Sequence, residues 1–262
     1  MKVSITIPVF NEEAQLAVSV AKLRAHLRSQ TGFELEVVIA DNGSTDQTLA
    51  IARALVQEWP ALRVVHLDAK GRGGALKHVW SESEADILTY MDVDLSTDLV
   101  AFGPLTEAVT TGGFDVAIAS RLHPDSRIRR GWRREIISRG YNRLVKAMFA
   151  TRFSDAQCGF KAITRAAARQ LLPVVEDGGW FFDTELLVIA EKCGYRILDL
   201  PVTWVEDVDT RVKVLLTAWS DLKGLARLYR QLRRGTYANL KESAPRSREP
   251  GLANLIHPGR QE

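Results

Sequence analysis

Two carboxylates, Asp92 and Asp94, follow the apolar segment 87–91 and are separated by a single residue. Alternate side chains of a strand share a face, so the two groups can converge on one hard cation such as Mg²⁺ or Mn²⁺. A cation held there would offset the charge of a nucleotide diphosphate. The same pattern often only ends a strand or caps the next helix, so its interpretation depends on the rest of the chain.

Three further apolar segments end in polar residues and are expected to be buried strands. They span residues 3–9, 35–40 and 63–67. Open α/β sheets bind ligands at the carboxyl ends of such strands. Asp41 after the second segment can accept hydrogen bonds from a base or a ribose. The loop 68–75 after the third combines glycines with Lys70 and Arg72 at a helix start, which favours phosphate. The chain is therefore expected to bind a nucleotide.

The polar motifs occur in a specific order. They run Pro8-Val9-Phe10-Asn11-Glu12-Glu13, Asp41-Asn42-Gly43-Ser44-Thr45-Asp46, Lys70-Gly71-Arg72-Gly73-Gly74-Ala75 and Asp92-Val93-Asp94, then Ser120-Arg121, Asp155-Ala156-Gln157-Cys158-Gly159-Phe160-Lys161 and Phe181-Phe182-Asp183-Thr184-Glu185. In this order the chain resembles family 2 glycosyltransferases, most of all their polyprenyl-phosphate mannose and glucose synthase branch, over roughly residues 3–211. The resemblance implies a GT-A fold, a mostly parallel Rossmann-like sheet between helices that binds a nucleotide-sugar with Mg or Mn.

The resemblance also implies a role for each matching position. The nucleotide-sugar would be bound by Pro8, Phe10, Glu12, Asp41, Asp68, Gly71, Arg72, Gly73, Ala75, Asp92, Val93, Asp94, Arg121 and Gln157. The catalytic group would be Asp92, Asp94, Asp183 and Arg211, with Asp92 and Asp94 as the metal ligands. The acceptor phosphate would be held by Arg133, Arg134 and Ser138. Guanidinium groups suit such oxyanions, although Arg133 and Arg134 lie in a run of charge that could simply be solvated.

Some positions leave alternatives open. Asp183 begins an expected helix, where it could pair with the helix dipole, bind sugar hydroxyls or act as a general base. The mannose synthases commonly have Gln and His after the aspartates, whereas this chain has Ser96 and Thr97. The third metal ligand is therefore open between Asp98 and water, and Ser96 or Thr97 could instead cap the helix expected at 99–109. The aromatic residues Trp180, Phe181 and Phe182 could line the sugar pocket or belong to the core.

Composition agrees with one α/β domain. A chain of 262 residues, 46% of them hydrophobic, can bury a substantial single core. We expect the GT-A domain over residues 1–235 and a disordered polar tail over 236–262. Further strands are expected at 115–119 and 195–204, and helices at 14–28, 45–58, 75–84 and 184–192. Cys158 and Cys193 give no disulfide framework, and no signal peptide or membrane-spanning stretch is apparent, so we expect a cytoplasmic protein without an anchor of its own.

The net charge of +3 hides two basic segments on an otherwise acidic chain. Residues 127–146 carry eight Lys or Arg against one acid, and residues 211–234 carry seven against one. Apolar residues recur at helical spacing within 127–150 and 211–234, so both segments could be amphipathic helices. Their apolar sides could pack on the core, or they could lie on an anionic membrane surface. Nucleic acid is a poorer partner because no recognised nucleic-acid module accompanies the charge.

The function expected from these features is a metal-dependent inverting transfer of a hexose from a UDP- or GDP-sugar to a polyprenyl phosphate, at the inner face of the cell membrane. The alternative is the same chemistry on a soluble or carbohydrate hydroxyl, which would require a base such as Asp183. A sugar-phosphate nucleotidyltransferase would have a glycine-rich loop after its first strand, where this chain has residues 8–13. A non-catalytic binding module is disfavoured because every expected carboxylate is present.

Overall fold

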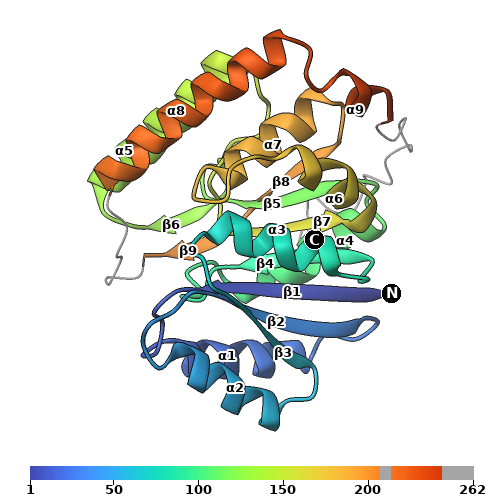
Figure 1. Ribbon diagram of the computed structural model, residues 1–262, viewed down its shortest axis with the longest axis vertical. Helices are drawn as coiled ribbons and strands as arrows, with labels where there is room; N and C mark the ends of the chain where they lie inside the picture. Colours follow the sequence, from blue (N-terminus) through green and yellow to red (C-terminus); the bar gives the residue numbers. More distant parts are fainter. Residues whose placement is uncertain (207–213, 244–262) are drawn as a thin grey trace, which may run out of the picture.

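The computed structural model describes residues 1–206 and 214–243, and at its centre is one seven-stranded sheet (Figure 1). The strand order is β3-β2-β1-β4-β7-β5-β8, and all neighbours are parallel except β7, which runs antiparallel to β4 and β5. The bounds are β1 Lys2–Val9, β2 Glu34–Asn42, β3 Leu62–Leu67, β4 Ile87–Met91, β5 Val116–Ser120, β7 Phe160–Thr164 and β8 Ile197–Pro201. The sheet confirms the expected mostly parallel architecture in a single domain.

Helices cover both faces of the sheet, and each face has its own hydrophobic core. One core contains residues of α1 Leu16–Leu27, α2 Thr48–Glu58 and α4 Phe102–Thr110. The other contains residues of α3 Arg72–Glu82, α6 Arg165–Leu171 and α7 Phe182–Lys192. Neighbouring strand residues go to opposite cores, as with Ile87 and Leu88, because side chains alternate across a pleated strand. The two faces of the sheet are thereby packed against helices, so the strand ends are where a ligand could reach it.

The antiparallel strand β7 explains how distant motifs meet. The carboxyl ends of β1, β2 and β4 lie at one edge of the sheet, where Val9 pairs with Asp41. Because β7 runs the opposite way, its first residue, Phe160, pairs with Met91 at the end of β4. Gly159 therefore lies beside Asp92, whose backbone N–H donates to the Gly159 carbonyl at 3.0 Å.

The expectation of one continuous strand at 195–204 is wrong, because the chain passes from one sheet to another within this segment. β8 ends at Pro201, and β9 Thr203–Val205 pairs with β6 Arg127–Arg129 in a separate two-stranded sheet. Between them, the Val202 N–H donates to the Ser126 hydroxyl at 3.0 Å instead of to a neighbouring strand. Short helical turns, η1 Leu99–Ala101 and η2 Leu172–Val174, complete the connections.

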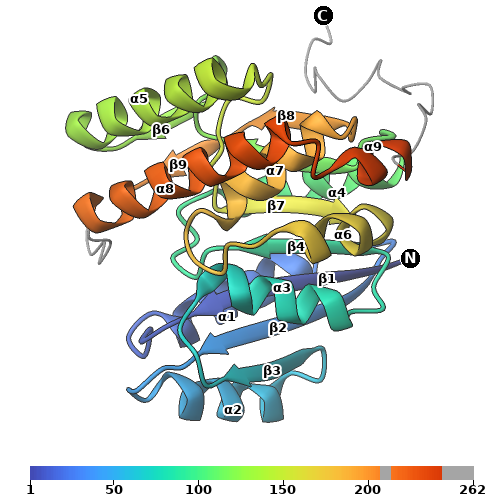
Figure 2. The same ribbon diagram turned by 45° about the horizontal axis from the view of Figure 1, so that its top comes forward.

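Two long helices, α5 Trp132–Phe149 and α8 Val214–Arg233, lie side by side at one end of the molecule (Figures 1 and 2). The expected packing of these basic helices on the core is present in part. Val145 and Phe149 of α5 and Leu225 and Leu228 of α8 are buried in the core. Other large apolar side chains stay exposed beside the basic residues, namely Trp132, Ile136 and Ile137 of α5 and Trp219, Leu222 and Tyr229 of α8.

A disordered tail was expected from residue 236 onward, and this expectation is wrong for residues 236–243. Residues Ala238–Ser243 form the short helix α9, and Tyr237 and Leu240 are buried against the core. The Tyr237 hydroxyl also donates to the Gln231 side chain at 3.0 Å. Residues 244–262 lie outside the described part of the chain. Within the described part, no helix has the length and apolar character required to cross a bilayer.

Candidate active site

Asp92 and Asp94 follow the end of β4, where the chain turns, with Val93 buried between them. The Asp92 side chain is 41% exposed, and one oxygen of Asp94 accepts the Ser96 N–H at 2.9 Å. Two accessible carboxylates are a hard-oxygen set that fits Mg²⁺ or Mn²⁺. Among the described residues no group of three or more His, Cys, Asp or Glu side chains is placed to hold a metal.

The residues after the aspartates have structural partners. Asp98, considered as a third metal ligand, caps η1 instead, because its carboxylate accepts the Val100 N–H at 3.0 Å. Thr97 is buried and forms a β-bridge with Trp204. The cap predicted at Ser96 or Thr97 is therefore wrong, and Asp98 provides it.

Gly159 packs so closely on Asp92 that a larger residue would have to displace the Asp92 side chain. A Cβ atom at this position would lie 1.8 Å from Oδ2 of Asp92. We expect Gly159→Ala to displace the Asp92 carboxylate and to lower kcat by about 100-fold, the scale of losing one group that stabilises transition-state charge. The protein should remain folded, because the Asp92 side chain is partly exposed and can move.

Steady-state kinetics and thermal unfolding of Gly159→Ala measure the two effects. Gly140→Ala is the matched control, since a Cβ at Gly140 in α5 would meet nothing within 4 Å. This control should keep wild-type activity and gain up to about 1 kcal/mol of stability from helix propensity. Equal activity of the two variants would show that the position of Asp92 is not critical.

Arg72 connects the metal-ligand candidate to the start of α7. Its guanidinium donates to Asp92 Oδ1 at 2.9 Å, to Asp183 Oδ2 at 2.6 Å and to the Tyr90 hydroxyl at 3.0 Å. Burial acts to lower the pKa of Arg72, but Asp92, Tyr90 and Asp183 outweigh it and raise the pKa well above its ordinary value. Arg72 is thus a permanent cation between two carboxylates.

Asp183 lies at the centre of the site with both oxygens occupied. Oδ1 accepts the Tyr90 hydroxyl at 2.6 Å and lies 3.0 Å from the Lys161 ammonium, while Oδ2 binds Arg72. Asp183 and Lys161 are each only 1% exposed. Burial acts to raise the pKa of Asp183, but Lys161, Arg72 and the Tyr90 hydrogen bond outweigh it and hold the pKa below its ordinary value. Such a carboxylate is a poor proton acceptor.

Sequence reasoning missed the roles of Tyr90 and Lys161 in this network. Both belong to strands and point to the same core, since Tyr90 of β4 pairs with Lys161 of β7. The available signal was a lysine within the otherwise apolar segment 160–163, because a fully buried lysine needs a partner.

The glycine-rich loop before α3 is packed against protein. The helix begins at Arg72, three residues earlier than expected, with Gly71 as its N-cap. The Gly74 N–H donates to the Gly178 carbonyl at 2.8 Å, and a Cβ at Gly73 would lie 2.4 Å from the Phe182 side chain. Ala75, next in the helix, is completely buried. These glycines therefore allow the loop before α7 to approach, in addition to any phosphate.

The expected nucleotide-binding residues surround the ends of β1 and β2. Asp41 is fully buried and its Oδ2 lies 2.6 Å from His66 Nδ1 of the neighbouring strand, a partner that the sequence did not indicate. The Glu12 N–H donates to the Thr48 hydroxyl at 2.7 Å. Lys70 Nζ lies 3.7 Å from the centre of the Phe10 ring. Pro8 is buried in β1, and Asp68 is fully exposed.

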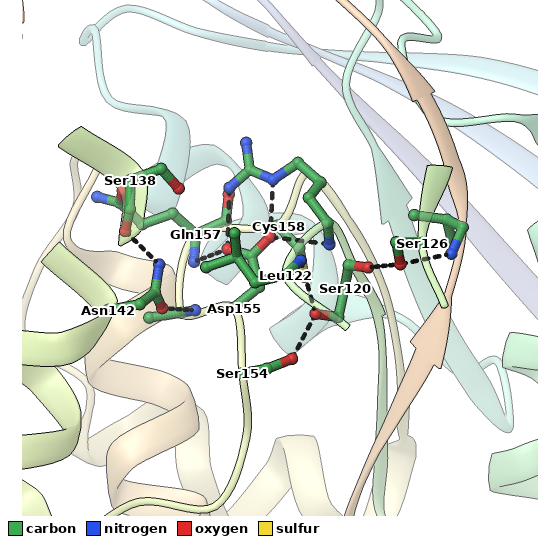
Figure 3. Close-up of polar contacts among 12 residues, drawn as sticks. Ser120, Leu122, Ser126, Ser138, Asn142, Ser154, Asp155, Gln157 and Cys158 are labelled. Carbon is green, nitrogen blue, oxygen red and sulfur yellow. Dashed lines mark hydrogen bonds and ion pairs between the residues drawn. The ribbon is translucent and has the colours of Figure 1, made fainter. Parts of the chain in front are cut away.

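Arg121 and Gln157 bind other protein groups. Arg121 forms a two-pronged ion pair with buried Asp155, at 2.7 and 2.9 Å, and also donates to the Gln157 carbonyl. Figure 3 shows Asp155 and Gln157 between Ser120 and the α5 residues Ser138 and Asn142. The Gln157 amide donates to Asp221 of α8 at 2.9 Å. Arg121 therefore fixes the segment 155–157, which contacts α5 through Asn142 and α8 through the Gln157 side chain.

The expected acceptor residues lie on α5 beside the site. Arg134 pairs with Glu206, and the guanidinium of exposed Arg133 lies over the Trp132 ring at 5.3 Å. The Ser138 hydroxyl is buried without a hydrogen-bond partner in the described part of the chain. Arg211, the remaining catalytic candidate, lies outside the described residues.

Two curated relatives match most of this chain. Glycosyltransferase AglD of Haloferax volcanii is 38% identical over 82% of this chain, and the dolichyl-phosphate beta-glucosyltransferase of Saccharomyces cerevisiae is 28% identical over 78% of it. The chain spans 35% and 66% of the lengths of these two relatives.

A solved structure shows the same fold. The glucosyl-3-phosphoglycerate synthase of Mycobacterium tuberculosis, in complex with Mn²⁺, UDP-glucose and phosphoglyceric acid, superposes with a TM-score of 0.61 at 20% identity, over 94% of this chain and 81% of the synthase. The profile of Glycosyl transferase family 2 matches residues 4–172. The chain is an enzyme of the glycosyl transferase family 2.

Proposed function

We propose that this enzyme transfers a hexose from a UDP- or GDP-sugar to a polyprenyl phosphate, with inversion at the anomeric carbon. One observation supports the choice of acceptor: both oxygens of Asp183, the residue considered as a base for a hydroxyl acceptor, are bound by Lys161, Arg72 and Tyr90. A hydroxyl acceptor needs a base, whereas a phosphate is already an anion near neutral pH and needs only to be positioned. The site suits the phosphate.

The relatives support this choice. The yeast relative is a dolichyl-phosphate glucosyltransferase, so its acceptor is a polyprenyl phosphate by name. The solved synthase of the same fold is in complex with UDP-glucose and Mn²⁺. We therefore place the nucleotide-sugar at the carboxyl ends of β1, β2 and β4, where Asp41, Phe10 and the start of α3 lie.

Asp92 and Asp94 would hold the Mg²⁺ or Mn²⁺ ion, which would neutralise charge on the departing diphosphate. Arg72 holds the Asp92 carboxylate in place and adds a fixed positive charge there. Arg133, Arg134 and Ser138 of α5 would hold the acceptor phosphate. Asp183 then acts by positioning Arg72 and Lys161, not by taking a proton.

The acceptor would reach the site from a membrane surface. The arm formed by α5 and α8 exposes Trp132, Ile136 and Trp219 next to many Arg and Lys side chains. Basic helices with exposed aromatic and aliphatic residues bind anionic lipid by combining charge attraction with insertion of the apolar side chains. We propose peripheral binding to the inner face of the cell membrane through this arm.

The test compares two acceptors that differ only in the phosphate. UDP-glucose, GDP-mannose and other donors carry a label on the hexose and are supplied with Mg²⁺ or Mn²⁺. Transfer of the label is measured to polyprenyl phosphate and to the polyprenol of equal length, each in anionic and in neutral vesicles. We expect transfer to the phosphate alone, faster in anionic vesicles and slowed by salt. Transfer to the polyprenol or to soluble sugars at a similar rate would instead establish a hydroxyl acceptor.

A further inference from the structure

Trp180 is exposed where its neighbours are not. Trp180 directly precedes Phe181, the N-cap of α7, and is 48% exposed. The next two residues, Phe181 and Phe182, are 1% and 0% exposed. Water against a large aromatic surface is unfavourable, and covering that surface with a ligand releases free energy.

The exposed indole belongs to a rigid loop. The Gly178 carbonyl accepts the Gly74 N–H at 2.8 Å, and a Cβ at Gly71 would lie 2.7 Å from the same carbonyl. The Asp177 carboxylate accepts the Gly179 N–H at 2.7 Å, and the Asp177 N–H donates to buried Glu185 at 2.7 Å. The loop is thus fixed to the starts of α3 and α7, so the exposure of Trp180 does not reflect a loose segment.

Trp180 also lies next to the charged centre of the site. Its ring centre is 5.1 Å from the Arg72 guanidinium, which itself binds Asp92 and Asp183. Arg72 thus connects the indole to the carboxylate that we assign to the metal, so a group resting on the free surface of the indole would belong to the same site. In a nucleotide-sugar, the hexose is joined directly to the diphosphate that the metal would bind.

We propose that Trp180 is the platform on which the hexose of the donor stacks, and that it positions the anomeric carbon for attack. This inference rests on the proposed function and names a further positioning residue for it. Hexopyranoses fit because their ring C–H groups form an apolar face while the hydroxyls point outward. The indole would then contribute to binding of the sugar part and not to binding of the nucleotide part.

The test compares a nucleotide-sugar with its own nucleotide, in the absence of acceptor. Dissociation constants of UDP-glucose and UDP, and of GDP-mannose and GDP, are measured calorimetrically with Mg²⁺. For the pair that the wild type binds, Trp180→Ala should raise the dissociation constant of the nucleotide-sugar by about 10-fold. The dissociation constant of the nucleotide should rise by less than about twofold. Trp180→Phe should recover most of the loss. Trp219→Ala is the matched control, since Trp219 is also exposed, at 61%, its ring centre lies 5.3 Å from the Lys223 ammonium, and the measurement contains no lipid for the arm to bind.

Intrinsic fluorescence gives a second readout. Binding of the nucleotide-sugar should quench the tryptophan fluorescence of the wild type and of Trp219→Ala more strongly than that of Trp180→Phe. Equal weakening of nucleotide and nucleotide-sugar in Trp180→Ala would overturn the inference, because Trp180 would then act only through Arg72. Unchanged affinities would overturn it as well. A wild-type protein that binds no nucleotide-sugar would contradict the proposed function itself, whereas wild-type transfer with an unaffected Trp180→Ala variant would contradict only the platform.

Discussion

Asp92→Asn and Asp94→Asn should each lower kcat by at least about 100- to 1,000-fold while the protein stays folded. An amide keeps the shape of the carboxylate but removes the charge that would hold the divalent cation. Loss of a group that stabilises developing charge has this effect on other enzymes. Circular dichroism and thermal unfolding check the fold, and transfer of labelled hexose measures activity.

A binding measurement separates metal loss from other defects. Mn²⁺ titration in the presence of UDP should detect one ion on the wild type and much weaker binding to both variants. Asp92→Asn also removes the ion pair with Arg72, so the fold of this variant is checked first. Asp98→Asn is the matched control, since Asp98 is exposed and caps η1. Near wild-type turnover and Mn²⁺ affinity in both Asp92→Asn and Asp94→Asn would remove the metal assignment.

The order of motifs along the chain allowed the fold and the position of the two aspartates to be predicted. Parallel strands bring their carboxyl ends to one edge, so a polar pair directly after an apolar strand is placed there by a local rule. Strand alternation did not apply to Asp92 and Asp94, because β4 ends at Met91. The boundaries that failed depended on tertiary contacts. The break between β8 and β9 follows from a hydrogen bond to Ser126, and the helix α9 follows from burial of Tyr237 and Leu240.

The partners of the candidate residues could not be predicted, because they come from distant parts of the chain. Arg121 was assigned to the donor by its type and position, but Asp155 occupies its guanidinium. Gln157 was assigned to the sugar, but it binds Asp221, 64 residues away. Asp183 was weighed as a base, a role that depends on whether a cation lies nearby, and Lys161 was not recognised as that cation. Residue type thus predicted where the site is, and the contacts decide what each group can do.

Lys161→Met should cost about 3–5 kcal/mol of unfolding free energy, a large effect for one substitution. Lys161 and Asp183 are both almost completely buried, 3.0 Å apart, and removing one member of such a pair leaves the other charge uncompensated. Arg72 and Tyr90 still contact Asp183, which limits the loss. Urea unfolding at pH 7 measures it. Lys2→Met is the matched control, because Lys2 pairs with Glu36 at a partly exposed site and should cost less than about 1 kcal/mol.

The dependence on pH and a double variant show whether charge causes this loss. The wild-type pKa of Asp183 lies below the ordinary value of 3.8, so its ionised form stabilises the fold above that pH, and this stabilisation disappears as the pH falls through the folded-state pKa. The difference between wild type and Lys161→Met should therefore shrink on acidification. Adding Asp183→Asn to Lys161→Met should restore part of the stability at pH 7, because the neutral amide no longer needs the ammonium. If the second substitution instead adds its own loss and the pH makes no difference, Lys161 stabilises the fold by packing alone, and only Arg72 and Tyr90 would then keep Asp183 from acting as the base that a hydroxyl acceptor requires.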